Sequence, residues 1–198
     1  MDLFAFSDAH LDRGLLEKIV AEPADLHVCL GDLTIFGRGL ETMAEVLAPL
    51  GDRLYLLPGN HETAEAVEQV CSQFGFRPLH AHSYAMRGGW FLAGVGLSPP
   101  TPFNTPGDVA DEDLAVVLEA YRGLSPLVLA AHVPPAETPL GTTVGGEAAG
   151  SKAIRRFIDE EQPALMLCGH VHESAEGETR IGRTRVVNPG RLGAHFQV

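Results

Sequence analysis

Short apolar runs alternate with amphipathic stretches along this chain of 198 residues. Six runs have the length and composition of buried β-strands, and they cover residues 3–6, 26–30, 54–57, 90–95, 127–131 and 165–168. Between them, apolar residues recur at spacings of three and four, which predicts amphipathic helices around residues 15–20, 67–74, 114–121 and 154–158. Ser151 is a suitable N-cap for the last helix, because its hydroxyl can accept hydrogen bonds from free amides of the first turn. The first half is therefore β-α-β-α-β, which predicts parallel strands with helices outside them.

The end of the chain has a different pattern. Strand-like segments at residues 173–181 and 184–188 flank Gly182-Arg183, a turn signal. We therefore expect a terminal hairpin, with the last few residues adding a further strand, and a second sheet that is antiparallel in part. The expected fold class is α/β, with two stacked mixed β-sheets flanked by helices (an α-β-β-α sandwich). We expect one domain that spans residues 1–198 and has no cap domain.

Polar side chains follow five of the predicted strands at the point where each strand ends. They are Asp8 and His10, then Asp32, then Asn60 and His61, then His132, and finally His170 and His172. In open α/β sheets, ligands bind beyond the carboxyl ends of the strands. We therefore expect these side chains to converge on one site, although they are far apart in the sequence.

The chemistry of this set points to a metal site. Asp, Asn and His supply oxygen and nitrogen donors without a thiolate, which suits manganese, iron, zinc and similar first-row ions. Two pairs are spaced i, i+2, so in extended chain each pair projects to one side. Gly31, Gly59 and Gly169 precede candidate ligands and leave room where backbones and metals approach closely.

The motifs that carry these residues resemble those of the calcineurin-like metallophosphoesterases. The matching segments are Asp8-x-His10, Gly31-Asp32, Gly59-Asn60-His61-Glu62, His132 and Gly169-His170-x-His172. The resemblance extends from residue 2 to about residue 190 and implies a double-sheet sandwich that holds two divalent metal ions. It further implies that the first metal is bound by Asp8, His10 and His172. The second metal would be bound by Asn60, His132 and His170, and Asp32 would bridge both.

The resemblance also implies a reaction. Two divalent cations lower the pKa of a bridging water, and the resulting hydroxide attacks the phosphoester. His61 would lie beside the metals without binding them and would protonate the leaving group as an imidazolium. Asp32, Asn60 and His61 are thus the expected catalytic residues, and Asn60 and His61 also contact the substrate. Mn²⁺ is the expected metal, and the same donors accept Fe, Zn, Ni or Co.

The substrate is less constrained. Phosphoprotein phosphatases of this superfamily carry a second carboxylate that pairs with the catalytic histidine, but Ile35 occupies that position here. A protein phosphatase is therefore disfavoured, and the group that orients His61 is left open. We expect the segments at residues 98–106 and 133–150 to form the rim of the site, and Arg38 to contact the substrate.

Three functions fit these residues. The first is hydrolysis of a small phosphodiester, cyclic nucleotides included. The second is hydrolysis of a phosphomonoester, and the third is a non-catalytic metal-binding scaffold on the same fold. The sequence leaves the choice between the diester and the monoester open.

The amino-acid composition limits which classes of partner and which compartment fit this chain. The formal net charge of −12 repels phosphate backbones, so extended nucleic-acid binding is not expected, and the expected partner is a small phosphoester. The three cysteines are few, odd in number and not spaced as CxxC, which indicates a reducing compartment. No apolar stretch is long enough to span a membrane and no secretory signal is visible, so we expect a cytoplasmic protein. The oligomeric state is open.

Overall fold

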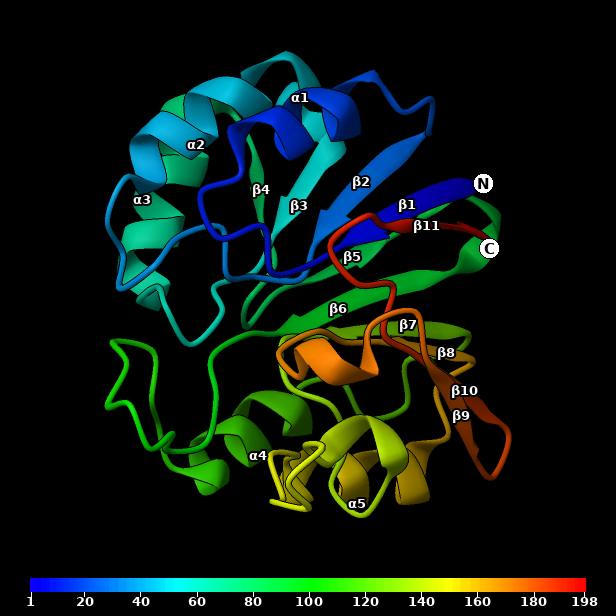
Figure 1. The fold of residues 1–198 in the computed structure, drawn as a ribbon. Helices are drawn as coiled ribbons and strands as arrows, with labels where there is room; N and C mark the ends of the chain where they lie inside the picture. The colour runs from blue at the N-terminus through cyan, green and yellow to red at the C-terminus, as the bar shows by residue number, and fades with distance from the viewer.

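The computed structural model describes all 198 residues and contains two mixed β-sheets packed face to face (Figure 1). The first sheet has the strand order β11-β1-β2-β3-β4. Its strands are β1 (Asp2–Phe6), β2 (Leu26–Cys29), β3 (Leu54–Leu56), β4 (Arg77–Pro78) and β11 (Ala194–Gln197). Strands β1 to β4 are parallel, as the β-α-β pattern predicts, and β11 pairs antiparallel with β1. The two termini therefore lie side by side.

The second sheet has the strand order β5-β6-β7-β8-β10-β9. Its strands are β5 (Ser83–Ala85), β6 (Phe91–Val95), β7 (Leu127–Ala131), β8 (Leu165–Leu167), β9 (Glu178–Ile181) and β10 (Thr184–Val187). The four inner strands are parallel, while β5 and β9 pair antiparallel at the edges. The expected terminal hairpin is confirmed as β9-β10.

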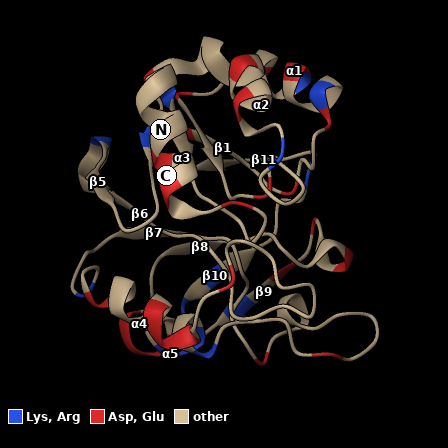
Figure 2. Ribbon diagram, turned by 90° about the vertical axis from the view of Figure 1, so that its left-hand side faces the viewer, with Lys and Arg blue, Asp and Glu red and all other residues tan.

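Helices cover both outer faces. Helices α1 (Arg13–Ala21), α2 (Leu40–Leu47) and α3 (Ala64–Phe74) pack on the first sheet, and α4 (Asp111–Glu119) and α5 (Lys152–Glu161) pack on the second. Figure 2 shows acidic residues on helices of both layers. Short 3-10 turns occur at Ala48–Arg53, Arg87–Gly89, Pro139–Gly141 and His172–Ser174. None of the helices has both the length and the apolar character needed to cross a bilayer.

The alternation of side chains along the strands explains the two layers. In β1, Phe4 and Phe6 pack against the helices, while Leu3 and Ala5 face the other sheet. Strand β7 repeats this arrangement in the second sheet, where Val128 lies among the inter-sheet residues. Successive side chains of a strand point to opposite faces, so every central strand contributes to two apolar layers. This is why these strands are almost continuously apolar in sequence.

The elements expected from the sequence are largely confirmed, with some differences. The short strands β4 and β5 were not expected. Helix α2 was not expected, although Leu40, Met43, Ala44 and Leu47 are buried at the spacing of a helix face. The first strand of the hairpin begins at Glu178 rather than at residue 173, because the 3-10 turn precedes it. The further strand expected from the last few residues is confirmed as β11, which joins the first sheet by pairing with β1. The N-cap is confirmed, since the Ser151 hydroxyl accepts a hydrogen bond from the backbone N–H of Ile154 (3.1 Å).

Candidate metal centre

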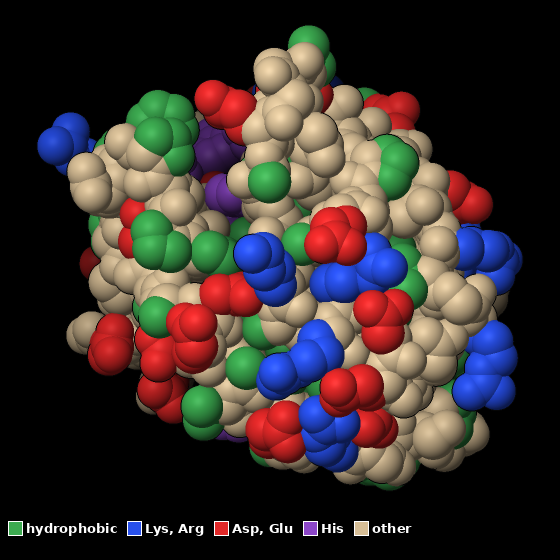
Figure 3. Space-filling view, turned by 90° about the horizontal axis from the view of Figure 1, so that it is seen from below, with side chains coloured by type: hydrophobic (Ala, Val, Ile, Leu, Met, Phe, Trp, Pro, Cys, Tyr) green, Lys and Arg blue, Asp and Glu red, His purple; other side chains and the backbone are tan.

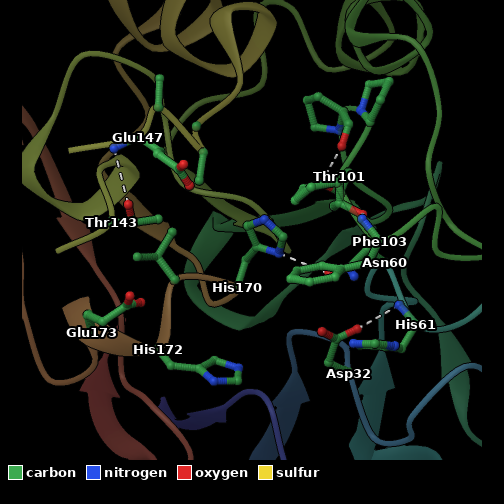
Figure 4. Close-up of a pocket in the computed structure, with 18 of the residues that line it drawn as sticks. Asp32, Asn60, His61, Thr101, Phe103, Thr143, Glu147, His170, His172 and Glu173 are labelled. Atoms are coloured by element: carbon green, nitrogen blue, oxygen red, sulfur yellow. Dashed lines mark hydrogen bonds between the residues drawn. The ribbon is translucent and has the colours of Figure 1, made fainter. Parts of the chain in front are cut away.

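The loops that follow β1, β2, β3, β7 and β8 meet at one edge of the sandwich, where the carboxyl ends of both sheets' parallel strands lie together. The structure brings all seven predicted metal ligands to this place. Figure 4 shows Asp32, Asn60 and His61 on one side of His170 and His172 on another. Metal binding by these residues stays a prediction.

The first group consists of Asp8, His10 and His172. The Nε2 atoms of His10 and His172 are 3.0 Å apart. Asp8 Oδ1 lies 3.5 Å from His172 Nε2 and 4.0 Å from His10 Nε2. Donors that share a first-row cation at about 2.1 Å lie roughly 3–3.5 Å apart, so this spacing is close to that of a metal site.

The second group consists of Asn60, His132 and His170. Asn60 Oδ1 lies 3.0 Å from His132 Nε2 and 2.9 Å from His170 Nδ1. Asp32 stands between the two groups, because its Oδ2 is 3.5 Å from His132 Nε2 and 4.0 Å from His10 Nε2. Its other oxygen accepts a hydrogen bond from the backbone N–H of His61 (2.9 Å). A single Asp32 oxygen therefore faces both groups.

The backbone at the centre is strained. Asp8, His10, Asp32 and His170 all have positive φ, between 43° and 69°. Residues with a side chain rarely adopt this left-handed conformation, and where they do so together the surroundings hold them at a functional site. Here the tight turn directly after each strand aims the side chain at the centre.

Gly59 is required by the same crowding. A Cβ atom at this position would overlap the carboxylate of Asp32 and lie 2.5 Å from the backbone nitrogen of Asp32. The role predicted for the motif glycines, close approach of backbone and ligand, is therefore observed here.

The donor set fits divalent cations. His10 Nδ1 lies 3.0 Å from the Thr34 carbonyl and must donate its proton there, so Nε2 presents a lone pair to His172. Asp8 Oδ1 is buried and has no hydrogen-bond partner. A buried carboxylate oxygen without a donor is costly, and a cation between these atoms removes that cost.

The electrostatics of the second group lead to the same conclusion. Burial alone would lower the pKa of His132, but the Asp32 carboxylate outweighs it and raises the pKa to about 9. The same interaction lowers the pKa of Asp32 against the opposing effect of its burial. Burial, together with the charge of His132, lowers the pKa of His170 to about 4. In this group the proton on His132 supplies the positive charge next to Asp32, and a bound cation would supply that charge instead.

His61 lies beside the centre, with one ring nitrogen within 4.8 Å of donor atoms of His10 and Asp32. Its Nδ1 accepts a hydrogen bond from the backbone N–H of Phe36 (3.1 Å). An imidazolium carries a proton on Nδ1 and cannot accept this bond, so the ring is neutral and its proton is on Nε2. This differs from the imidazolium expected from the resemblance. Burial lowers the pKa of His61 against the opposing charge of Asp32, in agreement with a neutral ring. The orienting group, left open by the sequence, is the Phe36 amide.

Glu62 is a residue whose role the sequence analysis missed. It is 1% exposed, and its two oxygens accept four hydrogen bonds. The donors are the backbone N–H groups of Asp32, Thr34 and Gly59 and the Thr34 hydroxyl, at 2.6–3.0 Å. Its place in the Gly59-Asn60-His61-Glu62 motif was the available signal, but four convergent donors from two loops are visible only in the fold.

A cleft of about 540 Å³ opens above the centre. Both segments expected at the rim line it, through residues 98–103 and residues 143 and 147–150. Figure 3 shows histidine side chains at the bottom of this hollow. Arg38, expected to contact the substrate, is exposed and does not line the cleft.

Comparison with known proteins gives the same classification. The sequence model of the calcineurin-like phosphoesterase family matches residues 3–174. The chain is 34% identical over 200 residues to the uncharacterized protein MJ1162 of Methanocaldococcus jannaschii, which covers 96% of this chain and 88% of that protein.

Solved structures share the fold. TT1561 of Thermus thermophilus superposes with a TM-score of 0.74 at 20% identity, covering 96% of this chain and 89% of that one. Phosphopantetheinyl hydrolase of Mycobacterium tuberculosis gives a TM-score of 0.70 at 18% identity, with coverage of 95% and 88%. A dimetal phosphatase of Danio rerio gives 0.60 at 12% identity, with coverage of 95% and 86%. These likenesses confirm the double-sheet sandwich.

Proposed function

Because the chain belongs to the calcineurin-like phosphoesterase family and is a metal-dependent phosphoester hydrolase, we propose that its substrate is a small phosphodiester. The observation that carries this choice is the lining of the cleft, which includes no lysine and no arginine. A phosphomonoester carries up to two negative charges, and enzymes commonly meet such charge with Arg or Lys beside the metals. A diester carries one charge and has two organic substituents, which need uncharged surface instead.

The walls of the cleft suit such substituents. On one side run Pro99, Pro100, Thr101, Pro102 and Phe103, and the Phe103 side chain is 70% exposed. Across the cleft, on the other side of His170, stand two exposed carboxylates without a protein partner, which can accept hydrogen bonds from hydroxyl or amino groups (Figure 4). They belong to Glu147 and Glu173. A flat substituent with polar hydrogens, such as a nucleoside, meets both walls.

We assign the metal-binding roles as the geometry groups the donors. Asp8, His10 and His172 hold one ion, Asn60, His132 and His170 hold the other, and Asp32 faces both. Two bound divalent cations supply neutralisation of the phosphate and acidification of water.

His61 acts on the leaving group. With Nδ1 held by the Phe36 amide, the ring directs its Nε2–H outward as a fixed hydrogen-bond donor. A donor placed in advance stabilises negative charge as it develops on the departing oxygen. Asn60 also lines the cleft, so the same residue that would bind the second metal can contact the substrate.

The proposal is tested by stripping the protein with a chelator and reloading it with Mn²⁺. Hydrolysis of bis-p-nitrophenyl phosphate is then compared with that of p-nitrophenyl phosphate, and the melting temperature is recorded before and after loading. We expect metal-dependent turnover that favours the diester. We also expect a higher melting temperature in the loaded protein, because ligands that bind only the folded state stabilise it.

The other outcomes of this experiment separate the alternatives. Preference for the monoester would identify a phosphomonoesterase. Two bound metals without turnover of either ester would leave the metal-binding scaffold. We propose Mn²⁺ as the metal, and reloading with Fe, Zn, Ni or Co in parallel tests this choice.

Phe103→Ala is expected to raise KM for a diester with an aromatic substituent by roughly 3–10-fold, the equivalent of about 0.5–1.5 kcal/mol for one aromatic contact. The KM for p-nitrophenyl methyl phosphate should change less than the KM for bis-p-nitrophenyl phosphate, because the methyl diester carries one aromatic ring instead of two. Val116→Ala is the matched control, because Val116 is 72% exposed on α4 and does not line the cleft. Equal KM values for wild type and Phe103→Ala would remove Phe103 from the substrate wall.

Two further proposals accompany this function. We propose that residues 1–198 act as one domain whose site is open, without a cap. We also propose that the protein works in a reducing compartment such as the cytoplasm, because Cys29, Cys71 and Cys168 are all free and buried.

A further inference from the structure

We propose that Thr105 and Asp108, which lie outside every metal-binding motif, are positioning residues for Asn60. They hold its side-chain amide with the oxygen toward the second metal. This inference rests on the proposed function, because that proposal makes Asn60 a metal ligand. It assigns a role to the segment after β6 that the motifs do not contain.

The contacts form a chain that leads away from the metal centre. Asn60 and Thr105 are 4% and 5% exposed. The amide nitrogen of Asn60 donates to the Thr105 hydroxyl oxygen (3.1 Å). The Thr105 hydroxyl in turn donates to Asp108 Oδ1. At the other end of the amide, Asn60 Oδ1 faces His132 and His170.

The direction of this chain decides which end of the amide faces the metals. The two ends of an asparagine amide have nearly the same shape, so packing alone does not distinguish them. A hydroxyl has one proton, and the Thr105 proton is committed to Asp108, because an ionised carboxylate can only accept. The Thr105 oxygen can then only accept from Asn60, which requires the NH₂ group there. The carbonyl oxygen, the end that can bind a cation, is thereby turned toward the second metal group.

Asp108 is itself held firmly. Its Oδ2 accepts the backbone N–H groups of Thr101 (2.9 Å) and Thr105 (3.2 Å), and the Thr101 hydroxyl also donates to it (3.1 Å). Next to it, the N–H of Gly107 donates to the Asn60 carbonyl (2.8 Å). A Cβ atom at Gly107 would lie 2.5 Å from the Glu62 carbonyl oxygen, so the segment packs directly on the loop that carries Asn60. The Asp108 carboxylate, which orients Asn60 through Thr105, therefore also holds Thr101 in the proline-rich wall of the cleft.

Removal of the Thr105 hydroxyl should weaken the second metal and spare the first. In Thr105→Val a methyl group of similar size replaces the oxygen, and the buried NH₂ of Asn60 loses its acceptor. The amide is then free to turn its nitrogen toward the cation. Partners that orient a metal ligand typically contribute about 10–100-fold in affinity. We expect a loss of that size for the second metal.

The experiment titrates the metal-free protein with Mn²⁺ by calorimetry. Wild type should bind two ions, Thr105→Val should bind the second about 10–100-fold more weakly, and Thr105→Ser should bind it nearly as wild type does. The first site, at Asp8, His10 and His172, reports within the same molecule that the variant is folded. Thr184→Val is the matched control, because Thr184 is buried in β10, its hydroxyl has no hydrogen-bond partner and it does not line the cleft, so both metals should bind as in wild type.

Asp108→Asn gives a second test that does not depend on how Thr105→Val folds. It leaves the Thr105 hydroxyl in place but removes its charged acceptor, so the second metal should again bind more weakly, by a smaller factor. If both variants bind two ions with wild-type affinity, the inference is wrong and the proposed function stands. If wild type binds fewer than two ions, the proposed function fails and the inference fails with it.

Discussion

His61→Ala is expected to lower kcat for diester hydrolysis by about 10²–10³-fold, the typical loss when one fixed donor to a developing charge is removed, while both metals stay bound. The reason is geometric. The backbone N–H of Phe36 holds Nδ1 of His61, so the proton of the ring is fixed on Nε2. The His61 side chain forms no hydrogen bond to Asn60 or to the histidine ligands and only contacts the edge of the His10 ring, so its removal leaves the donor groups of the metals complete. The measurement is kcat together with metal content by elemental analysis.

The dependence on the leaving group separates this role from a structural one. A poor leaving group develops more charge on the departing oxygen and needs the donor more, so the loss should be larger for an alkyl ester than for a p-nitrophenyl ester. His82→Ala is the matched control, because His82 is exposed and does not line the cleft. A variant that bound no metal would instead make His61 a ligand and overturn its assignment.

Much of the fold could be predicted because local pattern and tertiary packing agree. The continuous apolar run of Leu3 to Phe6 indicates a strand buried on both faces, and both faces are in fact covered, by helices on one side and by the second sheet on the other. The candidate ligands could be found for the same reason. Each stands directly after such a strand, and the carboxyl ends of parallel strands share one edge of a sheet.

The features that were missed depend on contacts between distant segments. Strand β11 pairs with β1 across nearly the whole chain, and nothing in Ala194–Gln197 distinguishes that partner from the neighbouring hairpin. The Phe36 amide that orients His61 is a backbone group in a loop, which no side-chain motif can reveal. The contact between Thr105 and Asn60 likewise joins two loops that are 45 residues apart.

The concentration of buried negative charge at the centre also could not be predicted from local sequence. Asp8, Asp32 and Glu62 are all buried, and the cleft above them has no lysine or arginine. Burial and the nearby Asp32 raise the pKa of Glu62. Its four donors nevertheless leave no acceptor for a proton on either oxygen, so the geometry requires the ionised form. Cations at the centre offset this concentration of negative charge, which couples metal binding to folding.

Glu62→Gln should therefore destabilise the protein although it keeps the size and shape of the side chain. The glutamine places an NH₂ group where one carboxylate oxygen now accepts two hydrogen bonds. At the Oε2 end, the backbone N–H groups of Asp32 and Gly59 would both lose their acceptor. Buried donors left unpaired cost about 1–3 kcal/mol each. Relief of the repulsion between Glu62 and Asp32 recovers part of this, so we expect a net loss of about 3 kcal/mol.

For a chain of this length, that loss lowers the melting temperature by roughly 6–12 °C. It should also weaken metal binding, because the backbone of Asp32 is released from the loop that carries Asn60. Glu68→Gln is the matched control, since Glu68 is exposed on α3 and has no hydrogen-bond partner there. Thermal melting with and without Mn²⁺ measures both effects. A Glu62→Gln variant that melted and bound metal as wild type does would contradict this role. It would show that an amide can replace the carboxylate in all four hydrogen bonds, so that the charge of Glu62 is not needed to hold the Asp32 and Asn60 loops together.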